Sequence, residues 1–267
     1  MGKRPLSLDV CGATDAGKMR AHNEDAFLIA NLTSGERCDS CASKASWAAD
    51  PRGVLLAVSD GMGGAKAGEV ASAMSLDTLF AGMIKGPEKD VDDARRLRRI
   101  VEQGSAQVHH ASRRPDRRGM GATLTTVFVR GDVAFLAHIG DSRAYLLRDG
   151  ALGQITHDQS YVQMLVDEGV LTEEQAERSP HKNIILQVMG QAEPVTVAMG
   201  RLSLQPGDRL LLCSDGLSNM VSSDELRALA TPPTPIEEAC TTLIKAANRA
   251  GGDDNITVVL AEVRQRV

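Results

Sequence analysis

The first half of the chain shows one apolar strand pattern followed by two helical patterns. Gly53–Val58 is continuously apolar and ends at Ser59-Asp60-Gly61, where glycine-rich turn chemistry predicts a loop. Apolar residues then recur at helical spacing over Lys66–Ile84, and a second helix is predicted for Asp92–Ala111. We therefore expect a buried strand followed by two amphipathic helices.

The middle of the chain has the pattern of paired strands and then becomes polar. Between Thr123 and Ile155, several apolar runs are separated by turn residues, which predicts an antiparallel meander. The segment Thr156–Gly200 is more polar, with short helices predicted at Ser160–Glu168 and Thr172–Glu177. We interpret this segment as an excursion from the sheet that could form a flap.

The last third of the chain combines strands and helices again. Arg209–Cys213 and the valine-rich run Ile256–Val263 predict strands. One helix is predicted to begin at Ser223, and a second, after a proline cluster, is predicted to end near Asn248. Helices and hairpins mix without regular βαβ alternation, so an α+β fold is expected rather than a doubly wound sheet. No low-complexity linker divides the sequence, which predicts a single domain over residues 1–267.

Composition narrows the functional class. The 267 residues can bury a sizeable core, and the 42% hydrophobic and 24% charged residues are typical of a globular protein. Aromatic residues make up only 3%, so base stacking on single-stranded nucleic acid is not expected. The net charge of −5 gives no general attraction for polyanions. We therefore expect no nucleic-acid partner.

Cysteine usage and apolar run length bear on the compartment. The five cysteines lack framework spacing, and Met1–Ala13 lacks the apolar stretch of a signal peptide. The longest apolar runs are far below the roughly 20 residues that cross a bilayer. A cytoplasmic protein without a membrane span is expected, and nothing in the pattern indicates an oligomer, so we expect a monomer.

Carboxylates stand at the ends of several predicted strands. Two apolar runs share the ending Ser-Asp-Gly, at Asp60 and at Asp215. Asp141 and Asp254 lie beside further predicted strands, and the pair Glu24-Asp25 adds a fifth acidic site.

For any one of these sites, a simple Asp-Gly turn is a sufficient explanation. In combination, carboxylates gathered at one sheet edge would repel each other and need a compensating cation. Ligation by oxygen alone favours Mg²⁺ or Mn²⁺ over Zn²⁺. Gly61 would let a backbone carbonyl approach such an ion closely.

The acidic residues belong to a series of short motifs that extends along nearly the whole chain. In chain order these are Arg20-Ala21-His22-Asn23-Glu24-Asp25, Ser59-Asp60-Gly61-Met62-Gly63-Gly64, Gly119-Met120-Gly121-Ala122-Thr123-Leu124, Gly140-Asp141-Ser142-Arg143, Thr156-His157-Asp158, Ser214-Asp215-Gly216-Leu217 and Gly251-Gly252-Asp253-Asp254-Asn255. Each motif alone is weak. In this order, they resemble the metal-dependent serine/threonine protein phosphatases of the PPM class, also called type 2C, in their bacterial form.

The resemblance implies a fold and a metal centre. The fold would be an α/β/β/α sandwich, with two stacked antiparallel sheets, helices outside and a cleft at one edge. Asp60 would bridge two Mn²⁺ or Mg²⁺ ions, with the Gly61 carbonyl, Asp215 and Asp254 as the other protein ligands.

Three further acidic residues have implied roles. By the same resemblance, Glu24 and Asp25 would mostly hold metal-bound waters. Asp141, together with Asp215, matches the place where bacterial members can hold a third ion.

Charge arguments suggest the mechanism. Two divalent ions about 3.5 to 4 Å apart can share a water, lower its pKa and direct the hydroxide at phosphorus, so no protein nucleophile is needed. The cysteines lack the phosphate-binding loop of cysteine-based phosphatases. Arg20 matches the family's phosphate-binding arginine, whose planar guanidinium can bind two oxygens. The alternative for Arg20 is a solvated surface side chain.

The general acid for the leaving alkoxide departs from the family pattern. Eukaryotic members have histidine directly after the Asp-Gly pair, where this chain has Met62, and many bacterial members have histidine where this chain has Ala65. His22 is one candidate acid, and a metal-bound water is the alternative.

Two motifs are expected to be structural. Cys38-Asp39-Ser40-Cys41 has no second pair at zinc spacing, which favours a variable loop over a metal or redox site. His157-Asp158, near the end of the predicted meander, is interpreted as part of a structural turn.

Two arginine clusters stand out in an acidic protein. They comprise Arg95, Arg96, Arg98 and Arg99, and then Arg113, Arg114, Arg117 and Arg118. Such runs are usually solvated helix faces. The alternative is a docking surface for acidic or phosphorylated partners.

These observations favour a cytoplasmic bacterial phosphatase that hydrolyses phosphoserine and phosphothreonine in proteins and opposes a serine/threonine kinase, the kinase being implied by the family alone. One alternative is a metal-binding regulatory module without turnover, supported by the missing histidine. Another is a phosphatase-fold regulator of sigma-factor partners, for which an intact Arg20-to-Asp25 motif is less expected.

Overall fold

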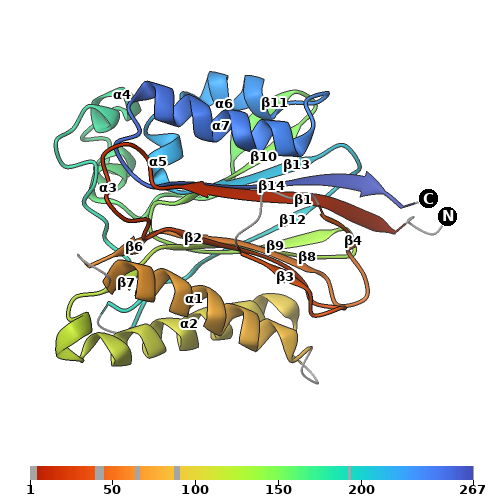
Figure 1. Cartoon of the computed structure of the whole chain (residues 1–267), viewed down its shortest axis with the longest axis horizontal. Helices are drawn as coiled ribbons and strands as arrows, with labels where there is room; N and C mark the ends of the chain where they lie inside the picture. Colours follow the sequence, from red (N-terminus) through yellow and green to blue (C-terminus); the bar gives the residue numbers. More distant parts are fainter. Residues whose placement is uncertain (1–4, 40–44, 64–66, 87–90, 192–193, 267) are drawn as a thin grey trace.

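Two stacked antiparallel sheets form the centre of the protein, with helices on both outer faces (Figure 1). The computed structural model describes residues 5–39, 45–63, 67–86, 91–191 and 194–266. One six-stranded sheet has the order β11 (Ala151–Gln154), β10 (Arg143–Arg148), β13 (Arg209–Cys213), β14 (Ile256–Gln265), β1 (Leu6–Asp15) and β4 (Ala45–Ala48). The other has the order β12 (Ala198–Ser203), β9 (Val133–Ile139), β8 (Leu124–Arg130), β5 (Val54–Ser59), β2 (Ala26–Asn31) and β3 (Arg37–Cys38). The expected α/β/β/α sandwich is therefore confirmed.

The helices form the two outer layers. Those beside the β5 sheet are α1 (Ala67–Ile84) and α2 (Asp93–Ser112), and those beside the β13 sheet are α5 (Asp215–Ser218), α6 (Ser223–Ala230) and α7 (Ile236–Ala250) (Figure 1). The predicted excursion over residues 156–200, called the flap below, contains α3 (Tyr161–Asp167) and α4 (Glu173–Glu177), and its last three residues belong to β12. Short elements complete the order: β6 (Gly61–Met62), β7 (Gly121–Ala122) and the 3₁₀ turn Pro115–Arg117. Each predicted helix is present, with ends within two residues of those expected.

Three apolar clusters hold the layers together. Leu76, Leu79 and Leu97 pack between the helices α1 and α2 and their sheet. A second cluster fills the space between the two sheets, and a third lies under α5, α6 and α7. Because β5 faces two of these clusters, both of its sides are buried, which explains why its sequence is continuously apolar.

The predicted meander over Thr123–Ile155 is wrong in one respect. β8 and β9 pair in one sheet, whereas β10 and β11 pair in the other. The chain crosses between the sheets at Gly140, which has a φ of 106°. A turn motif in the sequence does not specify whether the next strand joins the same sheet or the facing one.

The apolar pattern did not predict the strands β1 and β2. β1 pairs with β14 along its whole length, and β2 pairs with β5. Within the described residues, none of the helices has both the length and the apolar composition needed to cross a bilayer.

Candidate active site

The strand ends that carry carboxylates meet at one edge of the sandwich. β2 and β5 are antiparallel and pair Ala26 with Ser59, so Asp25 at the start of one strand lies beside Asp60 at the end of the other. In the facing sheet, β13 and β14 pair in the same way, which brings Asp215 and Asp254 to the same edge. Asp141 follows β9 there. The predicted gathering of carboxylates is present in the fold.

The backbone of Asp60 is fixed by Thr123. The Asp60 N–H donates to Oγ1 of Thr123 at 2.9 Å, and the Thr123 N–H donates to the Asp60 carbonyl at 2.8 Å. Thr123 Oγ1 also lies 2.7 Å from Oγ of Ser142, and both residues are fully buried. Thr123 was recognised only as part of a motif, and its contact with Asp60 depends on two segments about sixty residues apart.

Gly61 occupies a position that admits no side chain. Its N–H donates to the Glu24 carbonyl at 3.2 Å. A Cβ atom here would lie 2.1 Å from the Gly68 carbonyl oxygen and 2.6 Å from the Glu24 carbonyl oxygen. Glycine is therefore required for α1 and the Glu24 loop to approach the end of β5.

Asp25 is held by a serine from the other sheet. Oγ of Ser214 donates to Oδ2 of Asp25 at 2.6 Å, and the N–H of Thr257 donates to the same Oγ at 3.0 Å. Ser214 precedes Asp215, so one short segment supplies both a carboxylate and the hydroxyl that orients another. No role for Ser214 was predicted from the sequence.

Asn255 connects the Arg20–Asp25 loop to β14. Its Oδ1 accepts from the Glu24 N–H at 2.8 Å, and its Nδ2 donates to the His22 and Ala16 carbonyls at 2.9 and 3.0 Å. One buried amide thus satisfies two backbone groups of the loop and the Ala16 carbonyl that precedes it. Its adjacency to Asp254 is the only sequence signal for this role.

Burial and mutual repulsion perturb the carboxylates. Burial, followed by the neighbouring acidic charges, raises the pKa of Asp141 to about 8 and that of Asp25 to about 7. The same causes raise the pKa of Asp60 well above its usual range and also raise the pKa of Asp215. Burial raises the pKa of Glu24 as well. An assembly of this kind is unfavourable without a compensating cation.

The unpartnered oxygens indicate where a cation would bind. Oδ1 of Asp25, of Asp141 and of Asp215 are all buried, and none of them has a hydrogen-bond partner in the described part of the chain. Among the described residues, no group of three or more His, Cys, Asp or Glu side chains is arranged to hold a metal ion. Mg²⁺ retains several waters and is commonly held through one or two carboxylates, so an open set of oxygen donors fits a hydrated ion.

Arg20 lies at the mouth of this site. Its side chain is 55% exposed, and Nη2 donates to Oδ2 of Asp254 at 2.8 Å. His22 is also exposed, and its charge is among the causes that act on the pKa of Glu24. The structure thus places Arg20 and His22 beside the carboxylates.

Of the two positions that differ from the family pattern, Met62 lies within the described residues and Ala65 does not. Met62 lies in β6 and pairs with Gly121 of β7. Ala65 lies outside the described residues, as does Cys41 of the cysteine motif. Cys213 lies in the predicted strand β13, where it is buried.

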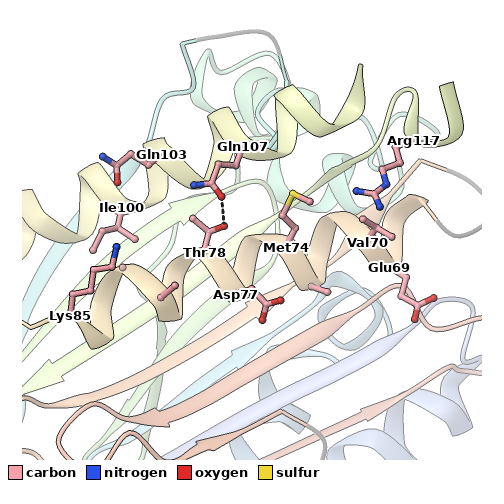
Figure 2. Close-up of a pocket in the computed structure, with 13 residues that line it drawn as sticks. Glu69, Val70, Met74, Asp77, Thr78, Lys85, Ile100, Gln103, Gln107 and Arg117 are labelled. Atoms are coloured by element: carbon pink, nitrogen blue, oxygen red, sulfur yellow. Dashed lines mark hydrogen bonds between the residues drawn. The ribbon is translucent and has the colours of Figure 1, made fainter. Parts of the chain in front are cut away.

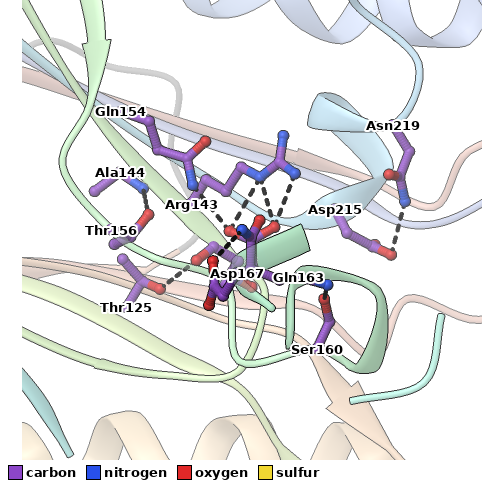
Figure 3. A network of polar contacts seen from close by, with 12 residues as sticks. Thr125, Arg143, Ala144, Gln154, Thr156, Ser160, Gln163, Asp167, Asp215 and Asn219 are labelled. Atoms are coloured by element: carbon purple, nitrogen blue, oxygen red, sulfur yellow. Dashed lines mark hydrogen bonds and ion pairs between the residues drawn. The ribbon is translucent and has the colours of Figure 1, made fainter. Parts of the chain in front are cut away.

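The flap is connected to β10 by a polar network (Figure 3). Nε and Nη2 of Arg143 donate to Oδ2 of Asp158 at 2.9 and 2.8 Å, and Nε2 of Gln154 donates to Oδ1 of Asp158 at 2.9 Å. His157 Nε2 lies 2.7 Å from Oδ2 of Asp167 in α3. These contacts agree with a structural role for His157 and Asp158.

A polar cavity of about 200 Å³ separates the flap from the carboxylates. Gln163 and Lys182 line it from the flap, and Asp141 and Asp215 line it from the sheets. Nδ2 of Asn219 donates to Oδ2 of Asp215 at 3.0 Å and fixes this carboxylate at the cavity wall (Figure 3).

Known proteins are similar to this chain in sequence and in fold. The serine/threonine protein phosphatase PstP of Mycobacterium tuberculosis is 40% identical over 265 residues, which cover 98% of this chain and 46% of PstP, so this chain spans about half the length of that relative. The protein phosphatase PhpP of Streptococcus pneumoniae is 39% identical over 259 residues, covering 97% of this chain and 98% of PhpP.

A solved structure extends the comparison. The crystal structure of the PstP catalytic domain in complex with two manganese ions superposes with a TM-score of 0.79 at 36% identity, covering 97% of this chain and 99% of that one. Residues 30–260 match the family described as Protein phosphatase 2C. The resemblance inferred from the motifs is confirmed, and the chain belongs to the protein phosphatase 2C family.

Proposed function

We propose that the chain is a metal-dependent phosphatase that hydrolyses phosphoserine and phosphothreonine in proteins. The observation that supports this most strongly is the set of buried carboxylates with unpartnered oxygens at one edge of the sandwich, with Arg20 at its mouth. Relatives named as serine/threonine phosphatases, and the manganese bound to the PstP catalytic domain, support the same activity.

The metal ligands in this proposal come from both sheets. Asp60 would lie between two Mn²⁺ or Mg²⁺ ions, with the Gly61 carbonyl, Asp215 and Asp254 as the other protein ligands. When bound, such ions lower the pKa of water and stabilise negative charge on a phosphoryl group. Every one of these oxygen donors suits a hard divalent cation.

Three other acidic residues complete the proposed metal site. Glu24 and Asp25 would orient waters of the hydrated ions. Asp141, together with Asp215, would contribute to a third ion beside the flap. The unpartnered Oδ1 atoms of Asp25 and Asp141 support these assignments.

The chain's own side chains bind the phosphate and transfer protons. The Arg20 guanidinium binds two phosphate oxygens and aligns the ester. His22 would protonate the leaving alkoxide, and the alternative acid is a water that the metal site would supply. The pH–rate profile of His22→Gln separates the two, because an unaltered profile removes His22.

The substrates in this proposal are phosphorylated proteins, and the opposing activity is a serine/threonine kinase. The PhpP relative matches over nearly its full length, which supports phosphatase activity for a domain of this size. The exposed rim around Arg20 and His22 supports access by a protein segment.

The test is Mn²⁺-dependent hydrolysis of para-nitrophenyl phosphate and of phosphoserine, phosphothreonine and phosphotyrosine peptides. We expect turnover of the ester and of the first two peptides, abolished by a chelator and by Asp60→Asn. Binding of Mn²⁺ without any hydrolysis would instead support a metal-binding regulatory module.

A further inference from the structure

The C-terminal end of α2 and the turn that follows it form a basic corner. We define this corner as His109, His110, Arg113, Arg114, Arg117 and Arg118, in a protein whose net charge is −5. All four arginines follow the last helical residue, Ser112, and three of them are exposed, while Arg117 is partly buried.

The basic corner lies at the edge of the sandwich where the carboxylates meet. The Met120 N–H donates to the Arg117 carbonyl at 3.2 Å, and the next residue, Gly121, pairs with Met62, two positions after Asp60. Figure 1 shows the end of α2 at the same side of the molecule as β6, β7 and α5.

The same corner also contacts the end of the flap. Nδ1 of His109 lies 3.1 Å from the Gly190 carbonyl oxygen. The corner therefore lies between α2 and the end of the flap, on the side of the molecule where the carboxylates meet.

The arginines of the corner are poorly neutralised. Arg114 and Arg117 share one partner, Asp116, at 3.4 and 3.7 Å. Within the described part of the chain, neither Arg113 nor Arg118 forms an ion pair with a carboxylate, and the contact of Arg113 is to His109, at 3.5 Å. Positive charge is thus in local excess at the rim of an acidic molecule.

The arginines at the start of α2 differ in their surroundings. Arg95 pairs with Asp92 at 3.3 Å, and Nη2 of Arg96 donates to the Gly82 carbonyl at 3.1 Å. Arg95 and Arg98 are exposed and Arg96 is buried, at the end of α2 far from the carboxylate edge (Figure 1). They provide a natural control for the corner.

The groove between α1 and α2 gives no comparable charge preference. This cavity of about 820 Å³ is lined by Glu69 and Asp77 as well as by Lys85 and Arg117 (Figure 2). The acidic and basic residues of this lining balance, so the groove adds no excess of positive charge to that of the corner.

We propose that the basic corner docks a stretch of Asp and Glu residues flanking the phosphoresidue of the protein substrate. The inference rests on the proposed phosphatase function and adds a substrate preference to it. Exposed arginines attract acidic segments over roughly a Debye length of about 8 Å at physiological salt. This attraction lowers KM for acidic phosphoproteins and leaves the chemical step unchanged.

The experiment compares two phosphothreonine peptides that differ only in flanking Glu or Gln residues. The wild-type protein is expected to show a lower KM for the Glu peptide at low salt, and the difference should shrink as salt rises. In the double variant Arg113→Gln/Arg118→Gln, KM for the Glu peptide should rise about three- to tenfold, as exposed ion pairs contribute modestly. The Gln peptide, para-nitrophenyl phosphate and kcat should be unaffected.

The matched control is Arg95→Gln/Arg98→Gln, which removes the same charge from the far end of α2. An equal rise in KM for this control would overturn the proposal, because net charge alone would then explain the effect. Equal KM values for the two peptides in the wild type would also overturn it. If the wild type hydrolyses neither peptide nor ester with Mn²⁺, the proposed function fails instead, which is a separate result.

Discussion

Nη2 of Arg20 lies 2.8 Å from Oδ2 of Asp254, in an ion pair between residues 234 positions apart. The hydrogen bond and the charge of Asp254 raise the pKa of the Arg20 guanidinium. Both side chains are partly solvated, at 55% and 35% exposure, and ion pairs of this kind contribute little stability. The guanidinium can therefore exchange a carboxylate oxygen for a phosphate oxygen at low cost.

Replacing Arg20 should separate phosphate binding from metal binding. Arg20→Ala is expected to reduce kcat/KM for phosphate esters roughly 10- to 100-fold, since hydrogen bonds to charged groups contribute about 1.5 to 3 kcal/mol. Arg20→Lys should recover only part of this loss, because lysine lacks the two-pronged geometry. Mn²⁺ titration calorimetry should show near-wild-type binding in both variants, and unchanged ester kinetics would refute the assignment.

Replacing Asp60 should remove the metal response while easing charge repulsion. The pKa of Asp60 is raised by burial and then by Asp25, Asp215, Asp141 and Asp254, so an uncharged isostere relieves repulsion in the metal-free protein. Asp60→Asn is expected to raise Tm in the presence of a chelator and to lose the increase in Tm that Mn²⁺ gives the wild type. Thermal unfolding with and without Mn²⁺ measures both effects. A variant that Mn²⁺ still stabilises to the wild-type extent would contradict the ligand assignment.

Thr123 should act on catalysis through the backbone of Asp60. Thr123→Val keeps the shape but removes the acceptor of the Asp60 N–H, leaving a buried donor unsatisfied at a cost of about 1 to 3 kcal/mol. Thr126→Val is the matched control. Oγ1 of Thr126 donates to the carbonyl of Leu56 in β5 at 2.9 Å, away from the carboxylates. Both variants should lose stability in urea, whereas only Thr123→Val should also lose kcat. Equal kcat values in the two variants would show that Thr123 is merely structural.

His138 should make the protein sensitive to mild acid. Burial lowers the pKa of His138 to about 4, and its Nδ1 lies 2.8 Å from Oγ1 of Thr125. The unfolded chain binds this proton near pH 6.5, so the contribution of His138 to stability is fully present above that pH. It is lost as the pH falls toward 4.

The size of this effect follows from the shift. About 2.5 pH units correspond to at most about 3 kcal/mol of unfolding free energy. His138→Gln is expected to flatten the decline in stability between pH 6.5 and 4, measured by urea unfolding at a series of pH values. Parallel curves for the variant and the wild type would disprove the titration of His138.

Several features of the fold and site were predictable because their causes are local. The continuous apolar run before Asp60 predicted a strand, and β5 is that strand. The helical spacing after Lys66 predicted α1 to within one residue. The shared Ser-Asp-Gly endings at Asp60 and Asp215 predicted carboxylates at strand tips.

Other features depend on contacts between distant segments. The turn at Gly140 resembles the turn at Gly131, yet one crosses between sheets and the other joins neighbouring strands. Ser214 and Asn255 hold Asp25 and Glu24, and their role is visible only after the two sheets are stacked. Hydrogen bonds of this kind have no periodic signal in the sequence.

The sequence by itself determined the local elements and the kind of chemistry, because apolar periodicity and residue type act within short segments. Only the tertiary structure decided which carboxylates share an edge and which oxygens lack partners. It also decided which arginines of the described chain lack a carboxylate partner near this edge. Burial and Coulomb interaction depend on distances between segments, and packing of the two sheets sets those distances.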